Sequence, residues 1–172
     1  MKETLKVVGR MHADGVIGKY AIGGAVGATF YIEPAATYDI DVFISFRDFP
    51  PGSLISLSTV YDYLRPLGYA ARGAHILIEG WEVQFLPAPD DLYEEALDEA
   101  IETQLDDVPT RVMTAEHLMA IALKTGRRKD LARIEQFVAD GVYDPGRLEK
   151  ILRKHHLEER WKAFNRENEG AE

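Results

Sequence analysis

The sequence has no cysteine and no long run of apolar residues. The absence of cysteine excludes disulfide bonds, a thiol nucleophile and any zinc or iron–sulfur site built from thiolates. No apolar segment approaches the ~20 residues that a helix needs to span a bilayer. The amino-terminal residues also lack the pattern of a signal peptide. We therefore expect a soluble cytoplasmic protein with no membrane partner.

Basic residues are in the minority, because 20 Lys and Arg stand against 29 Asp and Glu, giving a formal net charge of −9. Lys and Arg supply most of the non-specific affinity for nucleic-acid phosphates, so this charge argues against a generic nucleic-acid-binding protein. The imbalance is local: residues 90–107 hold nine acids and no Lys or Arg, whereas residues 111–166 are net basic. The cluster from Arg127 to Arg133 is open to two interpretations, a basic binding surface or an ordinary solvated helix face.

Two prolines, Pro87 and Pro89, divide a chain of 172 residues that is long enough to bury a core. Before them, short apolar runs alternate with helical periodicity, as in a mixed α and β unit. After them, the pattern is helical almost throughout. We predict an α+β fold, with a mixed-sheet core over residues 1–89 and a helical C-terminal region over residues 90–172 packed on that core.

The periodicity and the turn residues predict individual elements. Strands are expected at residues 20–22, 39–46, 75–79 and 81–86, the last two joined in a hairpin around Gly80. Helices are expected at residues 5–14, 25–31, 57–67, 92–105, from Thr114 onward, at 131–139 and from 145 to about 155. The polar tail over residues 165–172 is expected to fray.

The glycine pair Gly23-Gly24, followed by Asp39-Ile-Asp41, is the pattern with the most chemical content. Alternate residues of a strand point to the same face, so Asp39 and Asp41 can together hold a divalent metal ion. Without such a partner, carboxylates within an apolar strand are costly. At the glycine pair, the missing side chains let backbone N–H groups approach a phosphate at the start of a helix. The pattern predicts metal-assisted chemistry on a phosphate-containing substrate.

The segment Ile22-Gly23-Gly24, a short helix and then Thr37-x-Asp39-x-Asp41 resemble the signature of the nucleotidyltransferase superfamily, which has a DNA polymerase beta-like fold. The later segment over residues 123–131 resembles the C-terminal helical motif of a minimal bacterial branch that includes the effector of the AbiE-type toxin–antitoxin system. The resemblance implies a nucleotidyltransferase-like core that transfers NMP from an NTP to a hydroxyl or phosphate acceptor and releases pyrophosphate.

The same resemblance implies roles for individual residues. Asp39 and Asp41 would hold Mg²⁺ or Mn²⁺, and Gly23 with Gly24 would form the phosphate loop. The remaining nucleotide-binding residues would be Thr37 at the loop edge, with Lys124 and Lys129 facing the nucleotide or the acceptor. The implied partners are an NTP substrate, an acceptor that is a protein, a tRNA or a small molecule, and an antitoxin protein. From the residues alone, Lys129 and Asp130 can equally form a structural ion pair.

The third acid of the superfamily pattern is missing at its best match, where Gln84 stands between Val83 and Phe85. Glutamine is a poor metal ligand, and its amide cannot act as a base. Glu82 lies two residues earlier on the same strand face, about 7 Å away, and completes the catalytic set with Asp39 and Asp41 if the strand is shifted by two residues. Otherwise the chain is a nucleotide-binding or toxin–antitoxin partner module with impaired turnover.

Other interpretations of these motifs fit less well. The nucleophile motif of haloacid-dehalogenase-type phosphatases shares the spacing of Asp39 and Asp41, but it requires apolar residues before the first Asp, where residues 34–38 read Pro-Ala-Ala-Thr-Tyr. A glycosyltransferase DxD motif leaves Gly23-Gly24 unexplained. His155-His156 fits a helix end, where a cation favours the helix dipole, better than it fits a metal site.

Overall fold

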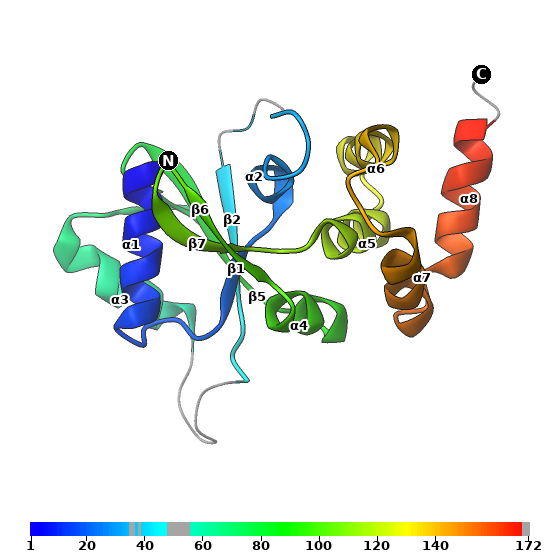
Figure 1. The fold of residues 1–172 in the computed structure, drawn as a ribbon. Helices are drawn as coiled ribbons and strands as arrows, with labels where there is room; N and C mark the ends of the chain where they lie inside the picture. Colours follow the sequence, from blue (N-terminus) through cyan, green and yellow to red (C-terminus); the bar gives the residue numbers. More distant parts are fainter. Residues whose placement is uncertain (35–36, 38, 48–55, 170–172) are drawn as a thin grey trace.

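The computed structural model describes residues 1–34, 37, 39–47 and 56–169. Its centre is a mixed sheet with the strand order β3-β4-β5-β2-β1-β7-β6 (Figure 1). The pairs β2–β5 and β1–β7 are parallel, and the other neighbouring strands are antiparallel. The strands are β1 (Tyr20–Ile22), β2 (Asp39–Ile44), β3 (Ala71–Arg72), β4 (His75–Ile78), β5 (Trp81–Pro87), β6 (Ile101–Leu105) and β7 (Val108–Val112).

Helices cover both faces of this sheet. One face carries α1 and α3, and the other carries α2 and the helices from α4 onward (Figure 1). None of the helices in the described part of the chain combines the length and the apolar character that a bilayer-spanning segment needs. The helices are α1 (Lys2–Ala13), α2 (Gly24–Ala28), α3 (Leu57–Leu64) with a 3-10 turn (Arg65–Leu67), α4 (Asp91–Asp98), α5 (Ala115–Thr125), α6 (Arg128–Asp140), α7 (Pro145–Lys154) and α8 (Glu158–Glu169).

Strand β2 places its two faces in different surroundings. Ile40, Val42 and Ile44 are buried in the cluster that includes α1 and α3. Because side chains alternate along a strand, Asp39 and Asp41 lie on the opposite face with Phe43, which is buried against the C-terminal helices. The two carboxylates therefore point to the side of the sheet that α2, α5 and α6 cover.

The α+β class, the mixed sheet and the hairpin around Gly80 are confirmed, but the helix expected over residues 92–105 is wrong. Helix α4 ends at Asp98, and β6 and β7 follow as a hairpin that adds two strands to the sheet. At its tip, Asp106 and Asp107 have φ values of +49° and +64°, the conformation of a two-residue type I′ turn. Strand β6 is a largely exposed edge strand of five residues, so the alternation of Ile-Glu-Thr-Gln-Leu is too short and too polar to have indicated a strand clearly.

Two further expectations change at the C-terminal side. The sheet continues past Pro89, because β7 pairs with β1 through Ile22 and Val112, so the part of the chain after residue 89 is not purely helical. Helix α8 extends to Glu169, beyond the start of the tail that was expected to fray, and residues 170–172 lie outside the described residues.

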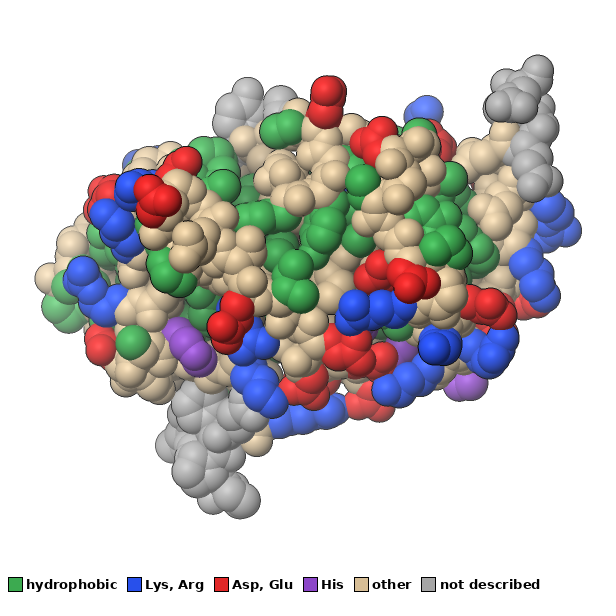
Figure 2. Space-filling model, in the orientation of Figure 1, with side chains coloured by type: hydrophobic (Ala, Val, Ile, Leu, Met, Phe, Trp, Pro, Cys, Tyr) green, Lys and Arg blue, Asp and Glu red, His purple; other side chains and the backbone are tan. Residues whose placement is uncertain are grey.

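The acidic segment that begins at Asp90 is matched by cations from several other elements. Figure 2 shows Asp and Glu side chains interspersed with Lys and Arg along the lower part of the visible face, where α4 and α7 lie. Exposed ion pairs each add little stability, so their main effect here is to neutralise the acidic run. The pairs are Asp90–Lys124 (2.6 Å), Asp91–Arg47 (2.6 Å), Glu95–Lys154 (2.6 Å), Asp98–Lys19 (2.7 Å) and Glu99–Arg147 (2.6 Å).

Alanine substitution at two helical glycines should change the free energy of unfolding in opposite directions. A Cβ at Gly27 in α2 would lie 2.9 Å from the carbonyl oxygen of Ile22, whereas a Cβ at Gly9 in α1 would meet nothing within 4 Å. We expect Gly9→Ala to raise the free energy of unfolding by about 0.5–1 kcal/mol. Gly27→Ala should lower it by about 1–3 kcal/mol, because α2 must move away from β1. Urea unfolding measures both, and a stabilised Gly27→Ala protein would contradict this packing.

Candidate active site

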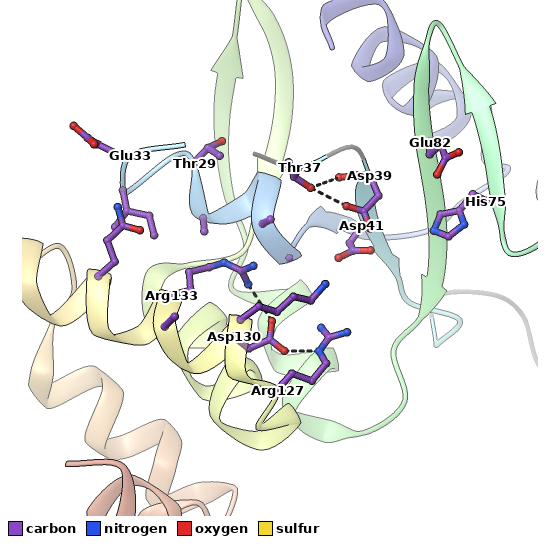
Figure 3. A pocket seen from close by; sticks show the side chains of 17 residues that line it. Thr29, Glu33, Thr37, Asp39, Asp41, His75, Glu82, Arg127, Asp130 and Arg133 are labelled. Atoms are coloured by element: carbon purple, nitrogen blue, oxygen red, sulfur yellow. Dashed lines mark hydrogen bonds and ion pairs between the residues drawn. The ribbon is translucent and has the colours of Figure 1, made fainter. Parts of the chain in front are cut away.

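A cavity of about 510 Å³ lies beside the exposed ends of β2 and β5, between α2 and α6. Its acidic side carries Asp39, Asp41 and Glu82 from the two strands, and its basic side carries Arg127 and Arg133 (Figure 3). Lys129, between these two arginines in the sequence, also lines the cavity. Opposite charges therefore face each other across one cavity. The other lining residues are Gly24, Ala25, Ala28, Thr29, Ile32, Glu33, Thr37, His75, Asp130, Ala132 and Gln136.

The parallel pairing of β2 with β5 decides which third residue joins the two aspartates. Asp39 is paired with Glu82, and Asp41 is paired with Gln84. Side chains of paired residues lie on the same face of a sheet, so all four belong to this side. Glu82 is exposed and lines the cavity, whereas Gln84 is half-buried and is not among the lining residues. Of the two β5 residues that are paired with the aspartates, only Glu82 therefore lines the cavity.

Both glycines of the Gly23-Gly24 pair let a side chain of β2 come close. Gly24 has a φ of +58°, and a Cβ there would lie 2.1 Å from Oδ2 of Asp41. At Gly23, a Cβ would lie 2.7 Å from the ring of Phe43. The backbone N–H of Gly23 donates a hydrogen bond to the carbonyl oxygen of Asp41 at 3.0 Å. The chain therefore needs glycine at these positions to seat Asp41 and Phe43, whatever the backbone does toward a phosphate.

The ionised form of Asp41 is destabilised in the folded protein. Burial raises the pKa of Asp41, and the nearby Asp39 carboxylate raises it further, while Arg127, Lys129 and His75 act in the opposite direction. Asp39 accepts a hydrogen bond from the Thr37 hydroxyl at 2.7 Å, so Thr37 contacts a carboxylate at the cavity. A carboxylate whose ionisation is opposed by burial and by a neighbouring carboxylate belongs to a site that a cation would stabilise.

The basic side is organised by a buried acid. Asp130 is 3% exposed and accepts hydrogen bonds from Nε of Arg127 at 2.5 Å and from Nη1 of Arg133 at 3.3 Å. The structural ion pair considered for Lys129 and Asp130 is therefore replaced by these two arginine pairs. Lys129 is exposed and lines the cavity.

The structure brings together most of the residues that the sequence singled out. Gly24, Thr37, Asp39, Asp41, Glu82 and Lys129 line the cavity, and Gly23 precedes them at the start of α2. Lys124 is not among the lining residues, and its ammonium group pairs with Asp90 at 2.6 Å.

Sequence reasoning missed His75, Arg127 and Arg133 as members of this site. The three-residue spacing of Arg127, Asp130 and Arg133 was a usable signal, because residues three apart share one face of a helix. His75 gave no such signal, since its place at the cavity follows from the pairing of β4 with β5.

Comparison with solved structures supports the nucleotidyltransferase-like fold. An antigenic nucleotidyltransferase-like protein from Paracoccidioides brasiliensis has a TM-score of 0.53 at 16% identity, over 81% of this chain and 74% of that one. The antibiotic-resistance factor ANT(2'')-Ia in solution has a TM-score of 0.54 at 12% identity, over 99% and 100%. Its crystal structure with adenylyl-2''-tobramycin has a TM-score of 0.54 at 11% identity, over 91% and 98%. Neither a protein-family model nor a curated protein matches the sequence.

Alanine at Gly24 should disturb the acidic site, whereas alanine at Gly73 should not. Both glycines have positive φ, but a Cβ at Gly73 meets nothing within 4 Å. Each substitution should therefore cost about 1 kcal/mol of stability through backbone strain. Only Gly24→Ala should also displace Asp41 and weaken Mn²⁺ binding by about tenfold or more, as measured by electron paramagnetic resonance. Equal Mn²⁺ binding by the two variants would contradict this role of Gly24.

Asp41→Asn should stabilise the metal-free protein at neutral pH. Because folding raises the pKa of Asp41, its ionised form destabilises the folded state at any pH above that folded pKa. Wild-type protein regains this stability as the pH falls through the folded pKa toward the ordinary pKa of an aspartate, so the advantage of the variant should shrink from pH 7 to about pH 4. Urea unfolding with a chelator tests this, and Glu135→Gln, at an exposed position of α6, is the control. A gain independent of pH would contradict the electrostatic cause.

Proposed function

We propose that this protein is a metal-dependent nucleotidyltransferase that moves NMP from an NTP to a hydroxyl or phosphate acceptor. The observation that carries the proposal is the cavity in which Asp39, Asp41 and Glu82 face Arg127, Lys129 and Arg133. Acids on one side suit divalent cations, and cations on the other side suit a polyphosphate. The structural similarity to nucleotidyltransferase-like proteins supports the same class of reaction.

The carboxylates fit a divalent metal such as Mg²⁺ or Mn²⁺. Asp39 and Asp41 lie on one strand face, and the pKa of Asp41 is raised, so a cation would relieve their repulsion. Within residues 1–34, 37, 39–47 and 56–169, no three acidic or histidine side chains already enclose a metal position. This fits Mg²⁺, which commonly takes one or two carboxylates and completes its shell with water and substrate phosphates. Once bound, such an ion neutralises charge that develops on the phosphates.

The basic side would hold the β- and γ-phosphates of the NTP. Arg127 and Arg133 offer planar guanidinium groups suited to phosphate oxygens, and Lys129 adds a mobile point charge. At the start of α2, the first N–H groups have no intrahelical partner, so the loop at Gly23 and Gly24 can also face a phosphate. Lys124 is engaged with Asp90 and stands outside this proposal.

The transfer would proceed by direct displacement at the α-phosphorus. The acceptor oxygen forms a bond to this atom while the bond to the bridging oxygen breaks, and pyrophosphate leaves with the bonding electrons. Glu82 takes the proton from an acceptor hydroxyl, because it lines the cavity and is paired with Asp39 on the neighbouring strand. Gln84 has no comparable capacity, since an amide is not a base.

An assay of NMP transfer tests the proposal. Wild-type protein with labelled NTP and Mg²⁺ should label one member of a panel of tRNA, protein and small-molecule hydroxyl acceptors such as aminoglycosides. Asp39→Asn and Asp41→Asn should lower the rate by about 10³-fold. Glu82→Ala should lower it by about 10²-fold or more, while the matched Gln84→Ala changes it little. No transfer to any acceptor, together with no NTP binding by calorimetry, would refute the function.

A second candidate follows from Gln84, which stands beside Asp41 where the superfamily pattern has an acid. In that case the protein binds NTP without turnover and acts as the partner of an antitoxin protein in a toxin–antitoxin pair. The two candidates differ in one outcome. The second candidate would be favoured if the protein binds NTP without transferring NMP. It also requires a protein complex on gel filtration that persists in Asp39→Ala and Asp41→Ala.

A further inference from the structure

We propose that Asp130 is a positioning residue that keeps the guanidinium group of Arg127 away from Asp41, so that the two aspartates of β2 stay open to a divalent cation. This inference rests on the proposed function, because it takes Asp39 and Asp41 as the metal-binding carboxylates. It concerns the protein before a nucleotide binds, when no phosphate is present to hold the arginine.

The contacts of Asp130 are those of a tether. Its carboxylate is buried and accepts from Nε of Arg127 at 2.5 Å, and its backbone N–H donates to the carbonyl oxygen of Arg127 at 2.8 Å. The side chain of Arg127 is 61% exposed, whereas that of Asp130 is 4% exposed. A long, exposed side chain is ordered by its fixed partner rather than by packing. The position of the Arg127 guanidinium thus depends on Asp130.

Asp41 is the competing partner for the same guanidinium. Arg127 and Asp41 line both the cavity of about 510 Å³ and a neighbouring one of about 60 Å³ that Asp130 also lines. The hydrogen bond to Asp130 raises the pKa of Arg127, and the charge of Asp41 raises it further; Arg127 in turn opposes the rise that burial causes in the pKa of Asp41. An arginine that paired with Asp41 would place its positive charge where a metal ion is needed.

The two ion pairs of Asp130 lie within one helix and its cap. Arg127 caps the start of α6, and Asp130 and Arg133 follow at three-residue intervals within that helix. The two ion pairs therefore join residues of one helix and its cap, and they do not fasten α6 to the sheet or to α5. Among the described residues, the Asp130 carboxylate accepts side-chain hydrogen bonds from Arg127 and Arg133 only. These pairs fix the direction of the guanidinium groups of two arginines that line the cavity.

Mn²⁺ binding without nucleotide, measured by electron paramagnetic resonance, tests the proposal. Asp130→Asn should weaken binding by about tenfold, since the released Arg127 pairs with Asp41. Asp130→Asn combined with Arg127→Gln should restore it to within about twofold of wild type. Asp130→Asn combined with Arg133→Gln has the same net charge but keeps Arg127, so its binding should stay weak. Asp140→Asn, an exposed acid on the same helix, is the control and should bind as wild type does.

The outcomes separate this inference from the function on which it rests. Unchanged binding in Asp130→Asn, or recovery in both double variants, would overturn the role of Asp130, the second result pointing to net charge alone. If circular dichroism shows that Asp130→Asn is unfolded, the Mn²⁺ affinity of Arg127→Gln decides the question. An affinity within about twofold of wild type supports the positioning role of Asp130. A tenfold gain overturns it, because Arg127 would then already pair with Asp41 in the wild-type protein. Wild-type protein that binds no Mn²⁺ would overturn both the metal site and the tether, whereas NMP transfer with an unaffected Asp130→Asn would overturn only the tether.

Discussion

The close approach of the Asp41 carboxylate to the backbone of Gly24 is the contact on which the arrangement of the site depends. It requires a residue with positive φ and no Cβ at the turn from β1 into α2. The same turn fixes where α2 lies against β2, and Phe43, next on the same face, packs against Gly23. A buried acid near a second acid lowers the stability of the fold, and this cost is the kind that functional sites retain. The rest of the fold thus offsets the cost of holding Asp41 near Asp39, a pair that hydrophobic packing alone would not favour.

The distribution of charge along the chain has a clear spatial result. The acids of residues 90–99 pair with Lys19, Arg47, Lys124, Arg147 and Lys154, which come from before and after this segment. Arg127 and Arg133 instead pair with an acid of their own helix and stay at the cavity. A protein with a formal net charge of −9 therefore still places Arg127, Lys129 and Arg133 along one cavity. Net charge alone is a poor guide to a local site, because fields near a cavity depend on the nearest side chains.

Much of the fold and part of the site could be predicted from the sequence because they depend on local patterns. The glycine pair, the alternation of β2 and the hairpin at Gly80 each have a short-range cause. The hairpin of β6 and β7 was missed, since its turn uses Asp106 and Asp107 in the left-handed conformation and its edge strand is largely exposed. The choice between Glu82 and Gln84 depends on the register of β5 against β2, which a single strand does not specify. Lys124 was assigned by resemblance, and its partner Asp90 lies 34 residues earlier in the chain.

The parallel pairing of β1 with β7 joins Ile22 to Val112, two residues that are 90 positions apart in the chain. At synthesis rates of ~5–20 residues per second, about 5–20 s separate the appearance of these two strands on the ribosome. Strand β1 can pair early with β2, its antiparallel neighbour, but its other edge must wait for β7. During that interval a buried central strand presents unpaired N–H and C=O groups, which makes the nascent chain a substrate for chaperones and a candidate for misassociation. The acidic half of the cavity is therefore synthesised well before the helix that supplies its cations.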